Sequence, residues 1–114
     1  MANLSAERSP SGLFRMATWE GDMAVIMITD LPGMDLDMLE GMRQAGVLDR
    51  MASASGFLWH WSGRTGTGYR VVEVWDSRDA WQDWYDGTVK PNMPPGIEPT
   101  EPTFLEVDTE VRPR

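Results

Sequence analysis

The sequence predicts an α+β domain whose strands and helices follow the order βαββαβ. Three observations lead to this prediction. An apolar run covers Met23 to Thr29, a strand, a glycine-rich turn, a strand and a helix follow one another from Gly56 to Val89, and apolar and polar residues alternate from Thr103 to Val111. The first pattern is typical of a central strand, the second of a hairpin that leads into a helix, and the third of a half-exposed strand.

Composition places the chain among ordinary globular proteins. Its 114 residues fit one domain, and 41% hydrophobic with 25% charged residues is typical of a soluble chain. No run approaches the ~20 apolar residues that span a bilayer, and the N-terminus lacks a secretory apolar stretch. The absence of cysteine excludes disulfides and thiolate sites. We therefore expect a cytoplasmic protein that does not bind membranes.

The charge argues against a nucleic-acid partner. The net charge is −8 and Lys90 is the single lysine, so a clustered basic face is not expected. The simplest reading of the negative charge is solubility. A cationic partner is the alternative.

The first half of the chain predicts a leader, a strand and a helix. Residues 1–12 lack periodicity and predict a flexible leader, followed by a single domain over residues 13–114. Leu13 to Trp19 could add a short strand. Asp35 is a plausible N-cap for a helix with apolar residues at helical spacing, and Gly46 stands where a helix-ending glycine is expected. The stretch from Val47 to Ser55 is left open, with a further helical turn as one possibility.

The second half predicts a hairpin, a helix and a last strand. Phe57 to Ser62 alternates, glycines supply a turn, and Tyr69 to Trp75 returns. Asp76 or Ser77 then caps a helix whose inner stripe includes Ala80, Trp81, Trp84, Tyr85 and Val89. Most of the prolines lie between Pro91 and Pro102, which predicts an extended connection before the strand from Thr103 to Val111. This order is ferredoxin-like: a four-stranded antiparallel sheet with two helices on one face.

The sheet face without helices is predicted to be apolar, because the first and third strands are apolar on both sides. An uncovered apolar face of this size is typical of an interface. We therefore expect a homodimer in which two subunits pack these faces about a two-fold axis. The alternative is a monomer whose leader or proline-rich segment covers the sheet.

These residues resemble a known family, the dimeric α+β barrel, in its antibiotic-biosynthesis-monooxygenase-like branch. The resemblance rests on Gly56-Phe57 at the start of a strand, on the run from Tyr69 to Ser77, and on the pair Trp81 and Trp84 in the following helix. It covers about residues 23–111. It implies the barrel fold and, because this fold hosts several activities, only a range of reactions.

Departures from the family pattern narrow that range. Haem-degrading relatives use an asparagine on the first strand and a histidine beyond the helical tryptophan. Trp84 matches that tryptophan, but Met23 to Thr29 offers no asparagine and Lys90 to Pro95 no histidine. Haem degradation is therefore not expected. The cofactor-free monooxygenases of polyketide pathways resemble the chain in the hairpin and the helix.

His60 is the single histidine and the first candidate for proton transfer. The alternative is a structural histidine bound to a backbone carbonyl or a neighbouring strand. Its neighbours depend on the hairpin register, because Arg70 and Glu73 lie on opposite faces of their strand. If Ser62 pairs with Tyr69, His60 shares a face with Tyr69 and Glu73, whereas a slip of one residue places it with Arg70.

The aromatic residues are candidates for a substrate wall. Trp59, Trp81, Trp84 and Tyr85 could line a pocket for a flat ligand, with Glu73 as a polar contact, although core packing alone would also explain the tryptophans. One histidine and no cysteine argue against a metal site. The glycine-rich stretch from Gly63 to Gly68 lacks the context of a phosphate loop and is interpreted as a hairpin turn.

The resulting hypothesis is an enzyme of secondary metabolism without a bound cofactor. It would oxygenate or cyclise an aromatic or polyketide-like substrate, with His60 moving the proton and Tyr69 or Arg70 holding an oxyanion. A second hypothesis is a non-catalytic dimeric small-molecule-binding or stress-associated protein with the same pocket. A third is a structural dimer without a cavity. Catalysis requires that His60 face a cavity with a second polar group within hydrogen-bond reach.

Overall fold

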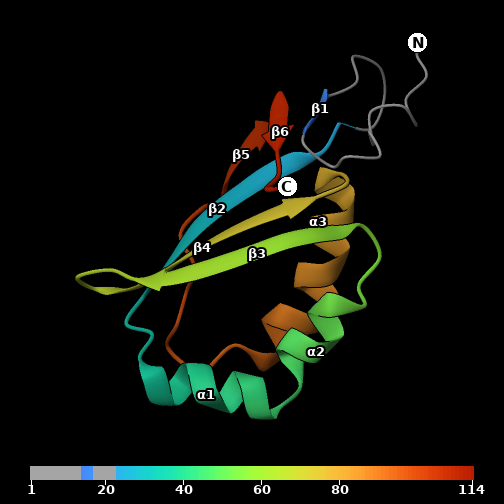
Figure 1. The fold of residues 1–114 in the computed structure, drawn as a ribbon. Coiled ribbons are helices and arrows are strands. Elements are labelled where there is room, and N and C mark those ends of the chain that lie inside the picture. Colours follow the sequence, from blue (N-terminus) through green and yellow to red (C-terminus); the bar gives the residue numbers. More distant parts are fainter. Residues whose placement is uncertain (1–13, 17–22) are drawn as a thin grey trace.

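The computed structural model describes residues 14–16 and 23–114. The predicted leader over residues 1–12, and most of the short strand allowed before Trp19, lie outside the described residues. The predicted order of strands and helices is confirmed (Figure 1). The elements of the main body are β2 (Val25–Pro32), α1 (Leu36–Gln44), α2 (Val47–Ala52), β3 (Phe57–Arg64), β4 (Gly68–Trp75), α3 (Arg78–Trp84) and β5 (Thr103–Glu106).

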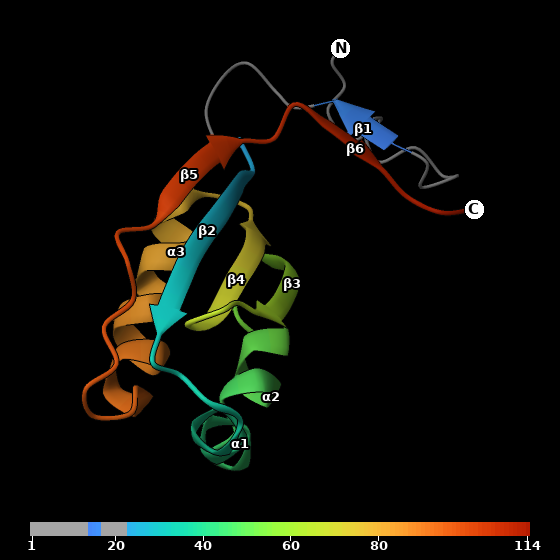
Figure 2. The same cartoon turned by 90° about the vertical axis from the view of Figure 1, so that its left-hand side faces the viewer.

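The four main strands form one antiparallel sheet in the order β3-β4-β2-β5. This is the expected ferredoxin-like arrangement, with the first and third strands of the body in the centre. The helices α1, α2 and α3 lie on one face of the sheet, and no described helix covers the other face (Figures 1 and 2). We call these the inner and the outer face.

Both long helices begin where the sequence indicates. The Asp35 side chain accepts a hydrogen bond from the Met38 backbone N–H at 2.9 Å, and Ser77, rather than Asp76, accepts one from Ala80 at 3.1 Å. These caps satisfy N–H groups that have no partner within the helix. Gly46, with φ of 83°, ends α1 and lets the chain turn directly into α2, so the open stretch after Val47 is helical.

The second long helix is not uniform. It begins as α3 and continues as a π-helical segment, η2 (Tyr85–Val89), before a short 3-10 turn, η3 (Lys90–Asn92). A π-helical turn widens the helix and is often found at functional sites. Here it carries Tyr85, which the sequence placed on the inner stripe of a regular helix.

The prediction of one last strand from Thr103 to Val111 is wrong. The segment divides into β5, which pairs with β2, and β6 (Thr109–Val111), which pairs with β1 (Phe14–Met16) in a separate ribbon. The break lies at Val107, which is buried and whose N–H donates to the Ala24 carbonyl at 2.8 Å. The ribbon of β1 and β6 therefore extends away from the main body (Figure 2).

The core consists of two clusters between the sheet and the helices. One contains Trp75, Trp81 and Trp84 with apolar residues of β2 and α2, and the other is built around Leu31, Met34, Tyr69 and Ile97. Close packing at the hairpin requires a glycine at position 68, since a Cβ there would lie 2.1 Å from the Leu31 carbonyl oxygen.

The outer face is apolar and open, as the sequence predicts. Trp61 is 67% exposed and Leu105 is 51% exposed, and both belong to strands of the main sheet. Leu105 lies on the outer face, while its neighbour Phe104 packs against the core on the inner face. In the part of the chain that the structure describes, no helix is long and apolar enough to cross a membrane.

Candidate functional site

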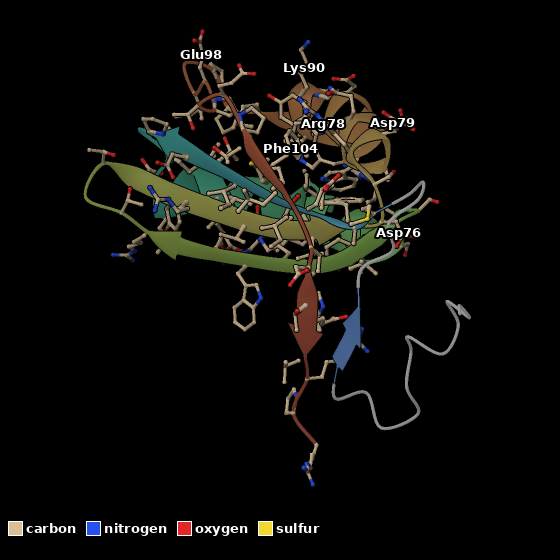
Figure 3. All side chains as sticks on the ribbon, turned by 90° about the horizontal axis from the view of Figure 1, so that it is seen from above. Asp76, Arg78, Asp79, Lys90, Glu98 and Phe104 are labelled. Atoms are coloured by element: carbon tan, nitrogen blue, oxygen red, sulfur yellow. The ribbon has the colours of Figure 1, made fainter. Side chains whose placement is uncertain are left out.

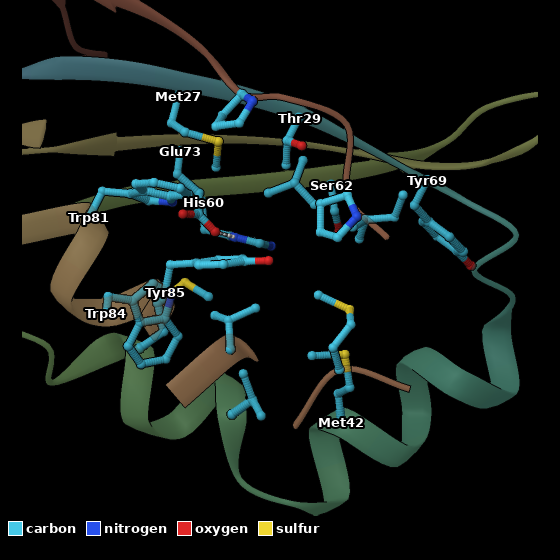
Figure 4. Close-up of a pocket in the computed structure, with 18 of the residues that line it drawn as sticks. Met27, Thr29, Met42, His60, Ser62, Tyr69, Glu73, Trp81, Trp84 and Tyr85 are labelled. Carbon is cyan, nitrogen blue, oxygen red and sulfur yellow. Dashed lines mark hydrogen bonds and ion pairs between the residues drawn. The ribbon is translucent and has the colours of Figure 1, made fainter. Parts of the chain in front are cut away.

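A cavity of about 360 Å³ lies between the inner face of the sheet and the helices. Most of its wall is apolar and comes from both core clusters, with Met27 and Val71 from the sheet and Met42 and Met51 from the helices. The proline-rich connection contributes Pro99 and Pro102 to the wall. Figure 4 shows polar side chains gathered at the sheet side of this cavity.

His60 lies on the cavity wall and pairs with Glu73 across the hairpin. The observed register places Ser62 opposite Val71 and His60 opposite Glu73, so His60 shares the inner face with Glu73 and Tyr69. The predicted pairing of Ser62 with Tyr69 is not observed, because Tyr69 lies opposite Arg64. The register differs from that pairing by two residues, so His60 keeps the face that the pairing implies, without Arg70. The His60 Nδ1 lies 2.9 Å from Glu73 Oε2. The second polar group required for proton transfer is therefore within hydrogen-bond reach.

Glu73 is bound on both carboxylate oxygens. While Oε2 meets His60, the indole Nε1 of Trp75 donates to Oε1 at 2.9 Å. Glu73 is only 4% exposed and Trp75 is fully buried, packed against Phe57 and Trp84 at ring-centroid distances of 5.4 and 6.0 Å. A buried carboxylate needs such partners. Glu73 lines the cavity as expected, but both its oxygens are engaged by the protein.

Tyr85 enters the cavity from the π-helical segment. Its ring stacks on Trp81 with centroids 5.2 Å apart, and Figure 4 shows its hydroxyl end directed toward the open centre of the cavity. Burial raises the pKa of Tyr85, and the charge of Asp86 raises it further. The phenol therefore keeps its proton at neutral pH and can donate a hydrogen bond.

Trp84 holds a buried hydrogen-bond donor. Its side chain is buried, it lines the cavity, and its indole N–H has no hydrogen-bond partner among the described residues. A buried donor without a partner is costly unless a ligand or a water molecule accepts from it. Trp81 also lines the cavity, edge-on to Phe104 at 5.1 Å. The predicted places of Trp81, Trp84 and Tyr85 on a cavity wall agree with the structure.

Two of the other predicted residues lie outside the cavity. Arg70 points to the outer face, where it binds Asp30 through contacts of 2.7 and 3.1 Å. Trp59 also lies on the outer face and donates to Glu110 at 3.3 Å. Both side chains are on the wrong side of the pleat to reach a ligand beside His60. This corrects the prediction of Arg70 as an oxyanion holder and of Trp59 as a substrate contact.

Tyr69 takes an intermediate position. It lines the cavity on the same face as His60, but Figure 4 shows its ring directed away from His60, toward the α1 end of the sheet. There it packs in the core cluster with Leu31, Met34 and Ile97. The oxyanion role predicted for Tyr69 therefore does not fit its direction, whereas Tyr85 points to the required place.

Several polar residues of the cavity wall were not predicted from the sequence, among them Thr29, Ser62 and Arg78. Thr29 and Ser62 line the cavity from β2 and β3. Arg78 also lines it, with its guanidinium 4.2 Å from the centre of the Phe104 ring (Figure 3). Ser62 could have been found, since it is two residues from His60 and therefore on the same face. Nothing in the local sequence around Arg78 indicates its place.

Among residues 23–114 and 14–16, no group of three or more potential ligands could hold a metal ion.

Comparisons with known proteins support the fold. No protein-family model matches the sequence, and no curated protein matches it. A cofactor-independent oxygenase from Streptomyces nogalater, SnoaB, is similar in structure with a TM-score of 0.57 and 16% identity, over 76% of this chain and 94% of that one. A candidate monooxygenase from Shewanella loihica has a TM-score of 0.54 and 17% identity, over 77% and 97%.

A third solved structure, MupZ from Pseudomonas fluorescens, has a TM-score of 0.53 and 11% identity, over 76% of this chain and 70% of that one. At such identities the likeness concerns the arrangement of the backbone, and the chemistry has to be argued from the site. The ferredoxin-like arrangement and the resemblance of the hairpin and helix agree with these matches. The chain therefore shares the ferredoxin-like α+β fold of these solved structures.

Proposed function

We propose that this chain is a cofactor-independent monooxygenase-like enzyme that acts on an aromatic or polyketide-type small molecule. The observation that carries the proposal is the place of His60. It lies on the wall of an apolar cavity with one ring nitrogen bound to buried Glu73 and the rest of the ring facing the cavity (Figure 4). A positioned imidazole of this kind is a suitable general base.

The reaction would begin with loss of a proton from the substrate to His60. An acidic C–H group beside an aromatic ketone, or a phenol conjugated with such a carbon, would yield a stabilised anion. Tyr85 would donate a hydrogen bond to its oxygen, because its hydroxyl end is directed into the cavity. Molecular oxygen would then oxidise the carbanion, with one oxygen atom retained as a carbonyl and the other released as water.

The shape of the cavity favours an aromatic substrate. Its volume of about 360 Å³ is within the usual range for small-molecule sites, which begins near 300 Å³. Trp81 and Tyr85 form a stacked pair on one wall, against which a flat ring system could pack. Methionines of the lining can adapt to a bulky apolar ligand.

Two alternatives share the same cavity. In a cyclase, the deprotonated carbon would attack a carbonyl of the same molecule, so that no oxygen is consumed. A binding protein would need the apolar walls but no proton acceptor. The buried carboxylate beside the single histidine favours catalysis over binding alone, because burying Glu73 costs stability that an apolar residue would not.

We also propose that the protein acts as a homodimer through the outer face of the sheet. Trp61 and Leu105 are large, apolar and exposed there, next to half-buried isoleucines and valines of β2 and β4. The proline-rich connection does not cover this face, since Pro99 and Pro102 line the cavity on the inner side. A second copy placing the same apolar strands against it would shield both.

The function is tested by incubating the protein with anthrone-type substrates under oxygen and following oxygen uptake and product absorbance. We expect His60→Ala to lower turnover about 100-fold or more, as loss of a general base usually does. Glu98→Gln is the matched control, because Glu98 is exposed and outside the cavity (Figure 3). Equal turnover in wild type and His60→Ala would contradict the proposal. Product formation without oxygen would identify a cyclase, and substrate binding without any turnover a binding protein.

A further inference from the structure

Three side chains form a continuous hydrogen-bonded row beneath the cavity. The Trp75 indole N–H donates to Glu73 Oε1 at 2.9 Å, and Glu73 Oε2 lies 2.9 Å from His60 Nδ1. Trp75 and Glu73 are both buried, whereas the end of the row, His60, reaches the cavity. The row therefore leads from the core to the ring that the proposed function uses as a base.

The direction of each hydrogen bond in this row can be assigned from the chemistry of the groups. An indole N–H only donates, so Glu73 Oε1 must accept from Trp75. A carboxylate likewise accepts on its second oxygen, so the hydrogen between Glu73 and His60 belongs to Nδ1. A neutral imidazole carries one N–H, and its Nε2 is then left with a lone pair.

We propose that Glu73, held by Trp75, is a positioning residue that keeps His60 in the Nδ1–H tautomer and directs a basic Nε2 into the cavity. The inference rests on the proposed function for its catalytic meaning, but the tautomer itself is a property of the free protein. Trp75 is needed to hold Glu73 in place, because it occupies Oε1. Without this hydrogen bond the carboxylate could rotate, or both of its oxygens could approach His60. Its indole cannot move easily, since it is fully buried against Phe57 and Trp84.

The same reasoning predicts the effect of the substitution Glu73→Gln. The new side-chain amide would have one acceptor oxygen and one donor NH2 group in place of two acceptors. Because Trp75 only donates, the amide oxygen must face it, and the NH2 group would then face His60. His60 Nδ1 would become the acceptor, the hydrogen would move to Nε2, and the nitrogen in the cavity would lose its lone pair.

The test uses the fact that His60 is the only histidine of the chain. Protein labelled with ¹⁵N-histidine gives one set of ring signals, and long-range ¹H–¹⁵N spectra distinguish the two neutral tautomers. We expect the Nδ1–H form in the wild type at alkaline pH, the Nε2–H form in Glu73→Gln, and a mixture in Trp75→Phe. An Nε2–H wild type would overturn the proposal, even if neither variant folds. Unchanged tautomers in folded variants would overturn it as well.

Activity provides the second measurement and separates the two proposals. If the proposed function holds, Glu73→Gln lowers kcat with little change in KM; the corresponding change in serine proteases costs about 10⁴-fold. If the wild type shows the Nδ1–H form but His60→Ala retains turnover, the positioning role stands and the proposed function fails. If His60→Ala is inactive while Glu73→Gln retains both the Nδ1–H form and full kcat, the function stands and the positioning role fails.

Discussion

Strand β4 carries two polar pairs of similar hydrogen-bond length on its opposite faces. Glu73 meets His60 on the inner face at 2.9 Å, and Arg70 meets Asp30 on the outer face at 2.7 and 3.1 Å. The side chains of His60 and Glu73 are 23% and 6% exposed, whereas those of Arg70 and Asp30 are 57% and 34% exposed. The contact distances are therefore poor guides to importance. Because the inner pair is buried, the loss of either partner is expected to cost considerable stability. Because the outer pair is exposed, solvent and salt screen it, and its contribution to stability is expected to be small.

The distribution of polar and apolar side chains over the two faces of the sheet is the reverse of the usual one. The face covered by helices contains the carboxylate, the histidine and a phenol, while the face without helices exposes Trp61 and Leu105. A chain selected only for the stability of a single copy would place the polar groups outside and the apolar groups inside. This exchange is what the proposed ligand cavity on the inner face and the proposed interface on the outer face would require.

The largest expected difference between the two pairs concerns folding stability. Replacing Glu73 by alanine leaves the buried indole N–H of Trp75 without an acceptor and should lower the free energy of unfolding by about 3 kcal/mol. Urea denaturation measures this change. The control is Glu106→Ala at an exposed position of β5, which should stay within about 0.5 kcal/mol of the wild type. Equal losses for the two variants would show that burial does not distinguish these carboxylates.

The second prediction concerns the outer face. Trp61→Asp places a charge on the most exposed tryptophan of the proposed interface and should weaken self-association by about 2 kcal/mol or more, roughly 30-fold in Kd. Sedimentation equilibrium at several concentrations measures it. Leu36→Asp, an exposed change at the start of α1 on the side of the helices, should leave association unchanged. A wild type that stays a single copy at micromolar concentration would refute the dimer.

The smallest effect is expected for the outer pair. The hydrogen bond from Arg70 holds the pKa of Asp30 below its ordinary value of 3.8, and the charge of Arg70 acts in the same direction. A lowered pKa in the folded state stabilises the protein above the unfolded value, and this contribution disappears as the pH falls through the folded value. Asp30→Asn should therefore differ slightly from the wild type at pH 6 and not at pH 2. A difference that grew toward low pH, measured by denaturant titration, would contradict this assignment.

The sequence was sufficient for the order of elements because their signals are local. Asp35 and Ser77 begin helices through side chains that bond the backbone three residues later, and the strands follow from periods of two residues. The place of Trp84 on an inward helical stripe follows in the same way. These features depend on neighbours in the chain rather than on the packing of distant segments.

Features that depend on distant packing were not predictable. The division of the last strand occurs because Val107 packs and bonds near Ala24, which the alternating pattern does not indicate. Tyr69 and His60 share a face, yet the Tyr69 ring turns toward the other core cluster, so a shared face does not ensure a shared direction. The change from an α-helix to a π-helical segment after Trp84 was not predictable either, because single sequences hold no clear signal for it.

The ribbon of β1 and β6 also affects how the protein moves through solution. The principal extents are 48 × 27 × 24 Å and the radius of gyration is 15.5 Å, against about 13 Å for a compact domain of about 100 residues. Hydrodynamic drag depends on shape as well as on mass. A single copy of 12.9 kDa should therefore elute from a gel-filtration column ahead of globular standards of the same mass, and light scattering rather than retention time should assign its stoichiometry.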